Sequence, residues 1–142
     1  MKQSKPTLYL LDTNTVAYVV DGRSRAARTT MSQRIQDSLI AISAITEGEL
    51  KYGLARKPEA VRLRSGIEAL LASVQILPWD SQAARAYGTL RAQLSAAGKA
   101  LSTMDLLIAA QAIASDAILV TRDAAFSQVQ ALRPVANWAT DL

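Results

Sequence analysis

The chain has 142 residues, half of them hydrophobic, and a formal net charge of +4. That length suffices for one core that buries roughly two-thirds of the unfolded surface, so we expect a single domain over residues 1–142. Histidine and cysteine are both absent. Their absence excludes imidazole catalysis, thiolate nucleophiles, zinc sites built from nitrogen and sulfur ligands, and disulfides. Any chemistry must therefore use carboxylates, hydroxyls, amines or a bound metal.

No segment of the sequence predicts a membrane span. Residues 101–120 are apolar, but Asp105, Gln111 and Asp116 interrupt them, so they lack the roughly 20 uncharged residues that cross a bilayer. The apolar run behind the basic start of the chain ends at Asp12 and is too short for the core of a signal peptide. We therefore expect a cytoplasmic protein without a membrane partner.

The first third of the chain alternates between strand and helix patterns. The continuous apolar run from Thr7 to Leu11 predicts a strand buried on both faces. A short helix is expected over 15–20, stopped by Asp-Gly, and an amphipathic basic helix over 24–37. Residues 39–43 are expected to form the second strand.

The rest of the chain continues this alternation. A helix from Ala44 carries Glu49 and breaks near Pro58, and another helix runs to about Ala72. The remaining expected elements follow in order: a strand over 74–77, a helix over 80–97, a helix over 104–114, a strand over 117–120 and a marginal fifth strand over 135–138. Such alternation implies right-handed crossovers. We predict an α/β fold with a mostly parallel, four- to five-stranded central sheet flanked by helices.

Four acidic residues follow predicted strands or lie early in helices: Asp12, Glu49, Asp105 and Asp123. In parallel sheets, ligands bind outside the carboxyl ends of the strands, where strand order reverses. The four acids are therefore predicted to share one pocket. Carboxylates that share a pocket repel each other and raise each other's pKa unless a cation compensates. Mg²⁺ or Mn²⁺ is the cation that suits oxygen ligands alone.

Each acid taken singly also has a structural interpretation. Asp12 suits a turn, Asp105 suits the positive end of a helix, with a gain of about 0.3–1 kcal/mol, Asp123 suits a cap, and Glu49 suits an exposed surface.

Glu47 lies two positions from Glu49, and two positions rotate a helix by about 200°. Because Glu49 lies one turn after the apolar Ile45, we assign Glu49 to the pocket and Glu47 to its rim or to solvent.

Positive charge is concentrated between residues 23 and 64. This segment holds four acidic residues and nine basic ones: Arg23, Arg25, Arg28, Arg34, Lys51, Arg56, Lys57, Arg62 and Arg64. A basic face beside an acidic pocket suits a polyanionic substrate. A solvated, arginine-rich helix face explains the charge equally well. Only 5% of residues are aromatic, so extensive base-stacking platforms are not expected.

Four short motifs occur in order along the chain: Leu11-Asp-Thr-Asn14, Ser43-Ala-Ile-Thr-Glu-Gly-Glu-Leu50 with Tyr52-Gly53, Met104-Asp-Leu-Leu-Ile-Ala-Ala110, and Leu119-Val-Thr-Arg-Asp-Ala-Ala-Phe126. They resemble the motifs of PIN-domain proteins, and their spacing is most similar to the VapC ribonuclease toxins of bacterial toxin–antitoxin modules. The resemblance implies a PIN-like fold and a cognate VapB-type antitoxin whose C-terminal segment covers the active-site groove. It also implies a homodimer.

The resemblance assigns roles residue by residue. Asp12, Glu49, Asp105 and Asp123 match the metal-binding acids of the family, and Thr121 and Asn14 match polar residues that support the pocket. Many relatives have Asn-Asn where this chain has Arg122-Asp123, so Asp123 is expected to bind metal either directly or through water. Arg25, Arg28 and Arg122 are the expected RNA contacts.

We therefore predict a Mg²⁺-dependent endoribonuclease, also active with Mn²⁺, that cuts tRNA or another structured RNA by attack of water. Water attack leaves a 5′-phosphate and a 3′-hydroxyl. The main alternative is a metal-free RNA-binding or scaffold module with the same fold. A phosphoacceptor receiver domain needs a lysine near its last strand, and no lysine follows Lys99. A structure-specific DNA nuclease of related fold needs more chain for its insertions.

Overall fold

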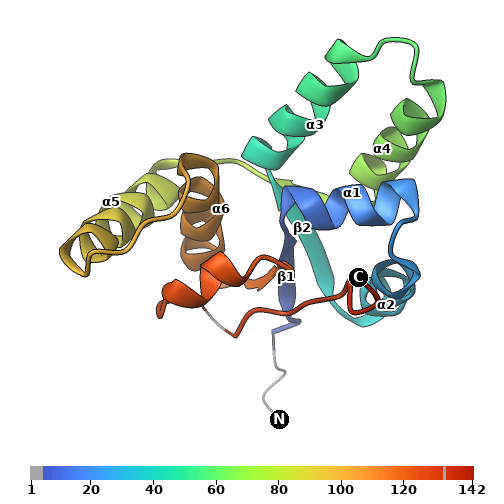
Figure 1. The fold of residues 1–142 in the computed structure, drawn as a ribbon. Coiled ribbons are helices and arrows are strands. Elements are labelled where there is room, and N and C mark those ends of the chain that lie inside the picture. Colours follow the sequence, from blue (N-terminus) through green and yellow to red (C-terminus); the bar gives the residue numbers. More distant parts are fainter. Residues whose placement is uncertain (1–4, 133) are drawn as a thin grey trace.

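A computed structural model describes residues 5–132 and 134–142 (Figure 1). The basic start of the chain, residues 1–4, lies outside the described residues. The strands are β1 (Leu8–Leu11), β2 (Leu39–Ser43), β3 (Gln75–Leu77) and β4 (Ile118–Val120). The helices are α1 (Thr13–Asp21), α2 (Arg25–Asp37), α3 (Ala44–Arg56), α4 (Val61–Ser73), α5 (Ser81–Ala96), α6 (Thr103–Ala114) and the 3₁₀ helix η1 (Ala124–Gln128). The elements predicted up to residue 120 are confirmed, with their ends shifted by a residue or two.

The four strands form one parallel sheet in the order β3-β2-β1-β4. The chain moves from β1 to one side through β2 and β3, and later returns to the other side of β1 with β4. Strand order therefore reverses at β1. Leu11 at the end of β1 is in register with Val120 at the end of β4. The residues that follow these two strands consequently emerge side by side, at the edge where such sheets bind ligands.

The predicted fifth strand over 135–138 is wrong as a strand. Only Ala136 pairs with the sheet, through a single parallel bridge to Val120. The Asn137 side chain then accepts a hydrogen bond of 3.0 Å from the Ala139 backbone N–H. This local turn bends the backbone away before a ladder can form, and Trp138 packs against Tyr9 instead, with ring centroids 5.2 Å apart.

The sheet separates two apolar cores, as expected for a sheet covered on both faces. One core joins the sheet to α5, α6 and the segment that contains Phe126. The other core joins it to α1, α2, α3, α4 and Trp138. Figure 1 shows α5 and α6 on one side of the sheet and α1 to α4 on the other. Among the described residues, every helix is too short or too polar to cross a bilayer.

Helix α1 has defined caps at both ends. Asp12 caps its start by accepting a hydrogen bond of 2.8 Å from the Thr15 backbone N–H. Gly22 ends the helix with a φ of 76°, a conformation that favours glycine. The Arg28 guanidinium on α2 then donates to the last carbonyls of α1, at 2.6 Å to Val19 and 3.0 Å to Val20. These caps fix the position of α1 beside the sheet edge.

A close approach also fixes α4 against α1. A Cβ atom added to Gly66 of α4 would lie 2.9 Å from the Val20 side chain of α1. Any larger residue at position 66 would push the two helices apart. The glycine therefore permits the contact that shapes the surface between these helices.

Asp141, near the end of the chain, accepts hydrogen bonds from the start of α2. Ser24 caps α2 and donates a hydrogen bond of 2.6 Å to the Asp141 carboxylate. The same carboxylate accepts from the backbone N–H of Arg25 at 3.1 Å and of Ala26 at 3.4 Å. These backbone donors are unsatisfied by the helix itself, so Asp141 acts as a second, distant cap.

Candidate active site

The four predicted acids occupy the carboxyl edge of the sheet and the helices beside it. Asp12 directly follows β1 and is 7% exposed. Asp123 follows β4, where its exposed side chain caps η1 by accepting from the Ala125 N–H at 2.9 Å. Asp105 lies in the first turn of α6, and Glu49 projects from the middle of α3. Four chain segments distant in sequence therefore contribute to one region around the end of β1.

The charges of the other three acids act on Asp105. Partial burial raises the pKa of Asp105, and the negative charges of Asp123, Asp12 and Glu49 raise it further, against a hydrogen bond from Ser102. Burial also raises the pKa of Asp12, more strongly than hydrogen bonds from Thr121 and Thr15 lower it. Ionised carboxylates so placed repel each other. A bound cation would relieve that repulsion.

Hydroxyl groups hold the acids in place. The Thr121 side chain lowers the pKa of Asp12, and its hydroxyl accepts a hydrogen bond of 3.0 Å from the Asp123 backbone N–H. It thus connects two of the acids, which supports the predicted role of Thr121. The Thr15 hydroxyl donates to the Val120 carbonyl at 3.2 Å and so joins α1 to the end of β4.

A second hydroxyl pair supports Glu49, and the sequence analysis missed it. The Thr13 hydroxyl donates a hydrogen bond of 2.9 Å to Glu49, and its oxygen lies 3.2 Å from the hydroxyl oxygen of the fully buried Thr46. The available signal was a threonine directly after Asp12 and another one helical turn before Glu49. Glu49 rather than Glu47 makes these contacts and acts on Asp105, as predicted.

The oxygen atoms at this edge suit a hard divalent cation. Within residues 5–132 and 134–142, however, no three acidic side chains are arranged to hold a metal ion by themselves. Mg²⁺ commonly keeps several waters and binds proteins through one or two carboxylates together with substrate phosphate. The donor set therefore fits a partly hydrated Mg²⁺ or Mn²⁺, and it does not form a closed all-protein cage.

A small polar hollow of about 310 Å³ opens beside the acids. We call it the polar hollow, and it is lined by Asp12, Asn14, Tyr18, Arg122, Asp123 and Ala124. The predicted residues Asn14 and Arg122 therefore lie next to two of the acids. Tyr18 was not singled out by the sequence, although it lies one helical turn after Asn14.

The other two predicted RNA contacts lie elsewhere. The Arg28 guanidinium donates hydrogen bonds to the carbonyls near the end of α1, so its described contacts are structural. Arg25 is exposed in the first turn of α2, where its backbone N–H contacts Asp141. Neither arginine lines the polar hollow.

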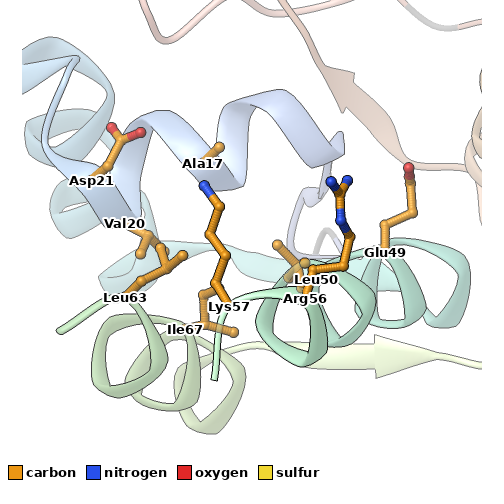
Figure 2. A pocket seen from close by; sticks show the side chains of 10 residues that line it. Ala17, Val20, Asp21, Glu49, Leu50, Arg56, Lys57, Leu63 and Ile67 are labelled. Carbon is orange, nitrogen blue, oxygen red and sulfur yellow. The ribbon is translucent and has the colours of Figure 1, made fainter. Parts of the chain in front are cut away.

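A larger, mostly apolar groove of about 380 Å³ lies on the Glu49 side of the acids (Figure 2). We call it the apolar groove, and it is lined by Ala17, Val20, Asp21, Glu49, Leu50, Gly53, Arg56, Lys57, Leu63 and Ile67. Figure 2 shows Arg56 and Lys57 reaching toward α1 from the end of α3, with Leu63 and Ile67 coming from α4. The groove thus has an apolar floor and both charge signs on its rim.

Comparisons with known proteins identify similar sequences. The family model described as PIN domain matches residues 9–132. Ribonuclease VapC2 of Rickettsia felis is 31% identical over 82% of this chain and 87% of its own length. Ribonuclease VapC2 of Haemophilus influenzae is 34% identical over 92% of this chain and 97% of its own length. The tRNA(fMet)-specific endonuclease VapC of Salmonella typhimurium is 28% identical over 92% and 97%.

Solved structures agree with these relatives. The chain superposes on the crystal structure of VapBC2 from Rickettsia felis bound to a promoter DNA fragment with a TM-score of 0.86 and 30% identity. That match covers 93% of this chain and 99% of the solved one. DNA-bound VapBC from Salmonella typhimurium gives a TM-score of 0.84 at 26% identity, over 93% and 98%.

Proposed function

This chain belongs to the PIN-domain family, among the VapC ribonucleases, and from that premise we propose that it is a metal-dependent endoribonuclease toxin. One observation carries the proposal. The negative charges of Asp12, Glu49 and Asp123, which come from three other parts of the chain, raise the pKa of the Asp105 carboxyl. A purely structural use of these acids gives no reason to gather their charges in one place.

The acids Asp12, Glu49, Asp105 and Asp123 would hold Mg²⁺, with Mn²⁺ able to replace it, and Asp123 would bind either directly or through water. When bound, the ion supplies an activated water and positive charge against the scissile phosphate. The chain itself positions the ligands. Thr121 and the Thr15 backbone N–H orient Asp12, while Thr13 orients Glu49. Ligands held in this way need little rearrangement when metal and RNA arrive.

The proposed substrate is RNA, and a tRNA in particular. A relative 28% identical to this chain carries the name tRNA(fMet)-specific endonuclease. Arg122 places a positive charge in the polar hollow beside Asp12 and Asp123, where it suits a phosphate next to the cleaved bond. Arg25 adds exposed positive charge on α2, and it remains a predicted contact for more distant phosphates.

The proposed partner is a VapB-type antitoxin whose segment occupies the apolar groove. The groove offers the apolar side chains Leu63 and Ile67 to such a segment and ends at Glu49. A basic side chain of the partner that reaches Glu49 would replace the charge of the cation and block the phosphate. The superposition on solved VapBC complexes supports this choice of occupant.

Two further properties belong to the same proposal. We expect a homodimer, for which exposed apolar residues such as Val61 on α4 supply contact area, and light scattering of the purified protein tests this. We also expect the protein in the cytoplasm, where its RNA substrate is made.

The alternative is a PIN-fold module that binds RNA without cutting it. Such a module has no need for the hydroxyls that fix the acids, so the Thr13–Glu49 and Thr121–Asp12 contacts favour the enzyme. The test is to incubate purified protein with labelled tRNA, other RNA and DNA, with Mg²⁺, with Mn²⁺ and with EDTA. We expect cleavage of RNA alone, only with metal, and a 5′-phosphate on the product. Binding of RNA without any cleavage under all metal conditions would favour the module.

Expression in cells gives an independent test. The chain alone should arrest growth, the Asp12→Asn variant should be tolerated, and co-expression with the small protein encoded beside it should restore growth. Normal growth with intact tRNA and ribosomal RNA, at equal levels of folded wild type, would contradict the toxin assignment.

A further inference from the structure

Helix α1 forms the wall between the two hollows at the acidic site. Asn14 and Tyr18, one helical turn apart, line the polar hollow. Ala17, Val20 and Asp21 form the neighbouring stripe of the same helix and line the apolar groove. Because successive residues turn a helix by about 100°, the centres of the two stripes are about a quarter turn apart. A molecule in one hollow is therefore separated by this helix from a molecule in the other.

The polar hollow contains a tyrosine that the proposed metal chemistry does not use. The Tyr18 ring is half-buried and packs against the core beneath α1. The Arg23 guanidinium carbon lies over this ring, 4.8 Å from its centroid. Asp21 holds that guanidinium through an ion pair of 2.7 Å from Nε and also accepts from the Arg23 backbone N–H at 2.9 Å. The ring and the guanidinium are thus arranged as a fixed pair.

Two other arginine–tyrosine pairs lie elsewhere on the protein and allow a comparison of their positions with that of the Tyr18–Arg23 pair. Arg56 lies 5.7 Å from the Tyr52 ring centroid on α3, and Arg91 lies 6.0 Å from that of Tyr87 on α5. Of these three tyrosines, Tyr18 lines the hollow that contains Asp12 and Asp123, whereas Tyr52 and Tyr87 do not. The Tyr18 pair is also the most closely stacked of the three.

We propose that the polar hollow is the subsite for the nucleotide beside the scissile phosphate, whose base packs against the part of Tyr18 that lines the hollow, with the ring held in place by Arg23, while Arg122 binds its phosphate. This inference rests on the proposed function. Aromatic rings and arginine planes are the usual stacking partners of unpaired RNA bases. A volume of about 310 Å³ is at the small end of ligand pockets, which are roughly 300–1,000 Å³. The hollow therefore suits one splayed nucleotide of a loop and is too small for a duplex.

The distribution of charge agrees with this assignment. Asp12 and Asp123 lie in the hollow with Arg122, so a phosphate placed between them needs the cation on one side and the arginine on the other. Asn14 adds an exposed amide that can donate to or accept from a base edge. The subsite thus combines a stacking surface, a hydrogen-bonding group and a charge for the phosphate.

The test measures the binding of a fluorescently labelled RNA stem–loop in the Asp105→Asn background, because Asp105 lies outside the polar hollow and its loss should prevent cleavage. Tyr18→Ala should weaken binding roughly ten-fold, the typical loss of one stacked base, whereas Tyr18→Phe keeps the ring and should stay within about two-fold. Arg23→Lys keeps the charge but loses the planar group, so it should lose part of the affinity. Tyr52→Ala removes a comparable Tyr–Arg pair outside the hollow and should have no effect.

The RNA supplies the second half of the experiment. Stem–loops with one abasic site, moved through the loop position by position, should reveal one base whose loss costs the same roughly ten-fold. In the Tyr18→Ala variant, removal of that base should not lower the RNA affinity further, because its stacking partner is already gone. Circular dichroism checks that each variant is folded, and Arg23→Ala, on the exposed surface, serves if Tyr18→Ala does not fold.

Each outcome decides between the two proposals. If the wild type cuts RNA but neither Tyr18→Ala nor Arg23→Ala weakens binding, the subsite is wrong and the ribonuclease stands. If binding depends on Tyr18 but the wild type cuts no RNA, the polar hollow binds a nucleotide of the RNA but the proposed activity, and with it a scissile phosphate, is wrong. An equal loss in Tyr52→Ala, or an abasic effect that persists in Tyr18→Ala, also overturns the subsite. Failure of every variant and of the wild type to bind or cut RNA overturns both.

Discussion

The Thr13 hydroxyl donates a hydrogen bond of 2.9 Å to the Glu49 carboxylate and so joins the first residue of α1 to the middle of α3. Hydrogen bonds to charged groups are worth about 1.5–3 kcal/mol. Thr13→Val keeps the shape of the side chain but loses the donor, so we expect kcat on RNA to fall roughly ten-fold and the melting temperature to fall as well. Steady-state kinetics at saturating Mg²⁺ measure this. Thr13→Ser is the matched control and should restore most of the activity. Equal kcat for Thr13→Val and wild type would show that Glu49 needs no such support.

The second prediction concerns Asp12 and Asp105. Asp12→Asn or Asp105→Asn should abolish cleavage, because each removes a negative charge from the proposed metal site. Asn caps a helix about as well as Asp, so Asp12→Asn should keep α1 and its hydrogen bond from Thr15. RNA cleavage and circular dichroism of the purified variants test the two statements separately. A folded variant that cuts RNA at a rate near wild type contradicts the metal-site assignment.

The same substitutions should change stability in a pH-dependent way. The pKa of Asp12 and of Asp105 is raised above the ordinary value of 3.8, so the folded state binds these protons more tightly than the unfolded state. The ionised carboxyls therefore cost stability that grows as pH rises from the unfolded pKa through the raised folded pKa. In EDTA at pH 7, the Asn variants should melt a few degrees above wild type, and the difference should vanish below about pH 3.8. A wild type that is the more stable protein in EDTA at pH 7 would refute this.

The third prediction ranks the two glutamates of α3. Glu49→Gln should lower cleavage strongly, because Glu49 contacts Thr13 and acts on Asp105. Glu47→Gln removes the same charge from the same helix and serves as the control, with an expected loss of less than about three-fold, since a group at the rim contributes little. Parallel kinetics of both variants at equal Mg²⁺ decide the ranking. A larger loss for Glu47→Gln would reverse our assignment.

The fourth prediction separates two arginines of α2. Arg25→Ala should weaken RNA binding and lower the log–log salt slope by about one unit or slightly less if Arg25 meets one phosphate. Arg28→Ala should instead lower the melting temperature, because the Val19 and Val20 carbonyls lose their donor. Binding measured over a range of salt, together with thermal melts, tests both variants. An unchanged salt slope for Arg25→Ala would mean that this charge is only solvated.

The fifth prediction concerns the end of the chain. Hydrogen bonds from Ser24 and from backbone N–H groups of α2 lower the pKa of Asp141. A lowered folded pKa stabilises the protein above the unfolded value of 3.8, and this stabilisation is lost as pH falls through the folded pKa. Asp141→Ala should therefore lower the melting temperature at neutral pH and show a smaller gap to wild type in acid. The conservative variant Asp141→Asn keeps an acceptor for Ser24 and should lie between them. A constant gap at all pH values would exclude a role for the charge.

Periodicity predicted the elements well because the strands are short, largely apolar runs and every α-helix except α4 begins with a side-chain cap, such as Ser102 before α6. The predicted fifth strand failed because Asn137 makes a local turn that competes with strand pairing. The closeness of Asp12 and Asp123 was predictable since the ends of the parallel strands β1 and β4 lie in register. The structural contacts of Arg28 were not predicted, because spacing shows that an arginine is exposed on a helix but not that two carbonyls of another helix accept from it. Thr13 and Tyr18 depend on distances between helices, which no local pattern contains.

The position of α1 between the two hollows has an evolutionary consequence. Substitutions at Ala17 or Val20 alter the wall of the apolar groove, and substitutions at Asn14 or Tyr18 alter the wall of the polar hollow. Neither pair of positions is shared, and Asp12 and Gly22 fix the ends of the helix whatever stands between them. Under the proposed assignment of the antitoxin to the apolar groove and of RNA to the polar hollow, descendants of this sequence could exchange one antitoxin for another while the preference for RNA is inherited unchanged.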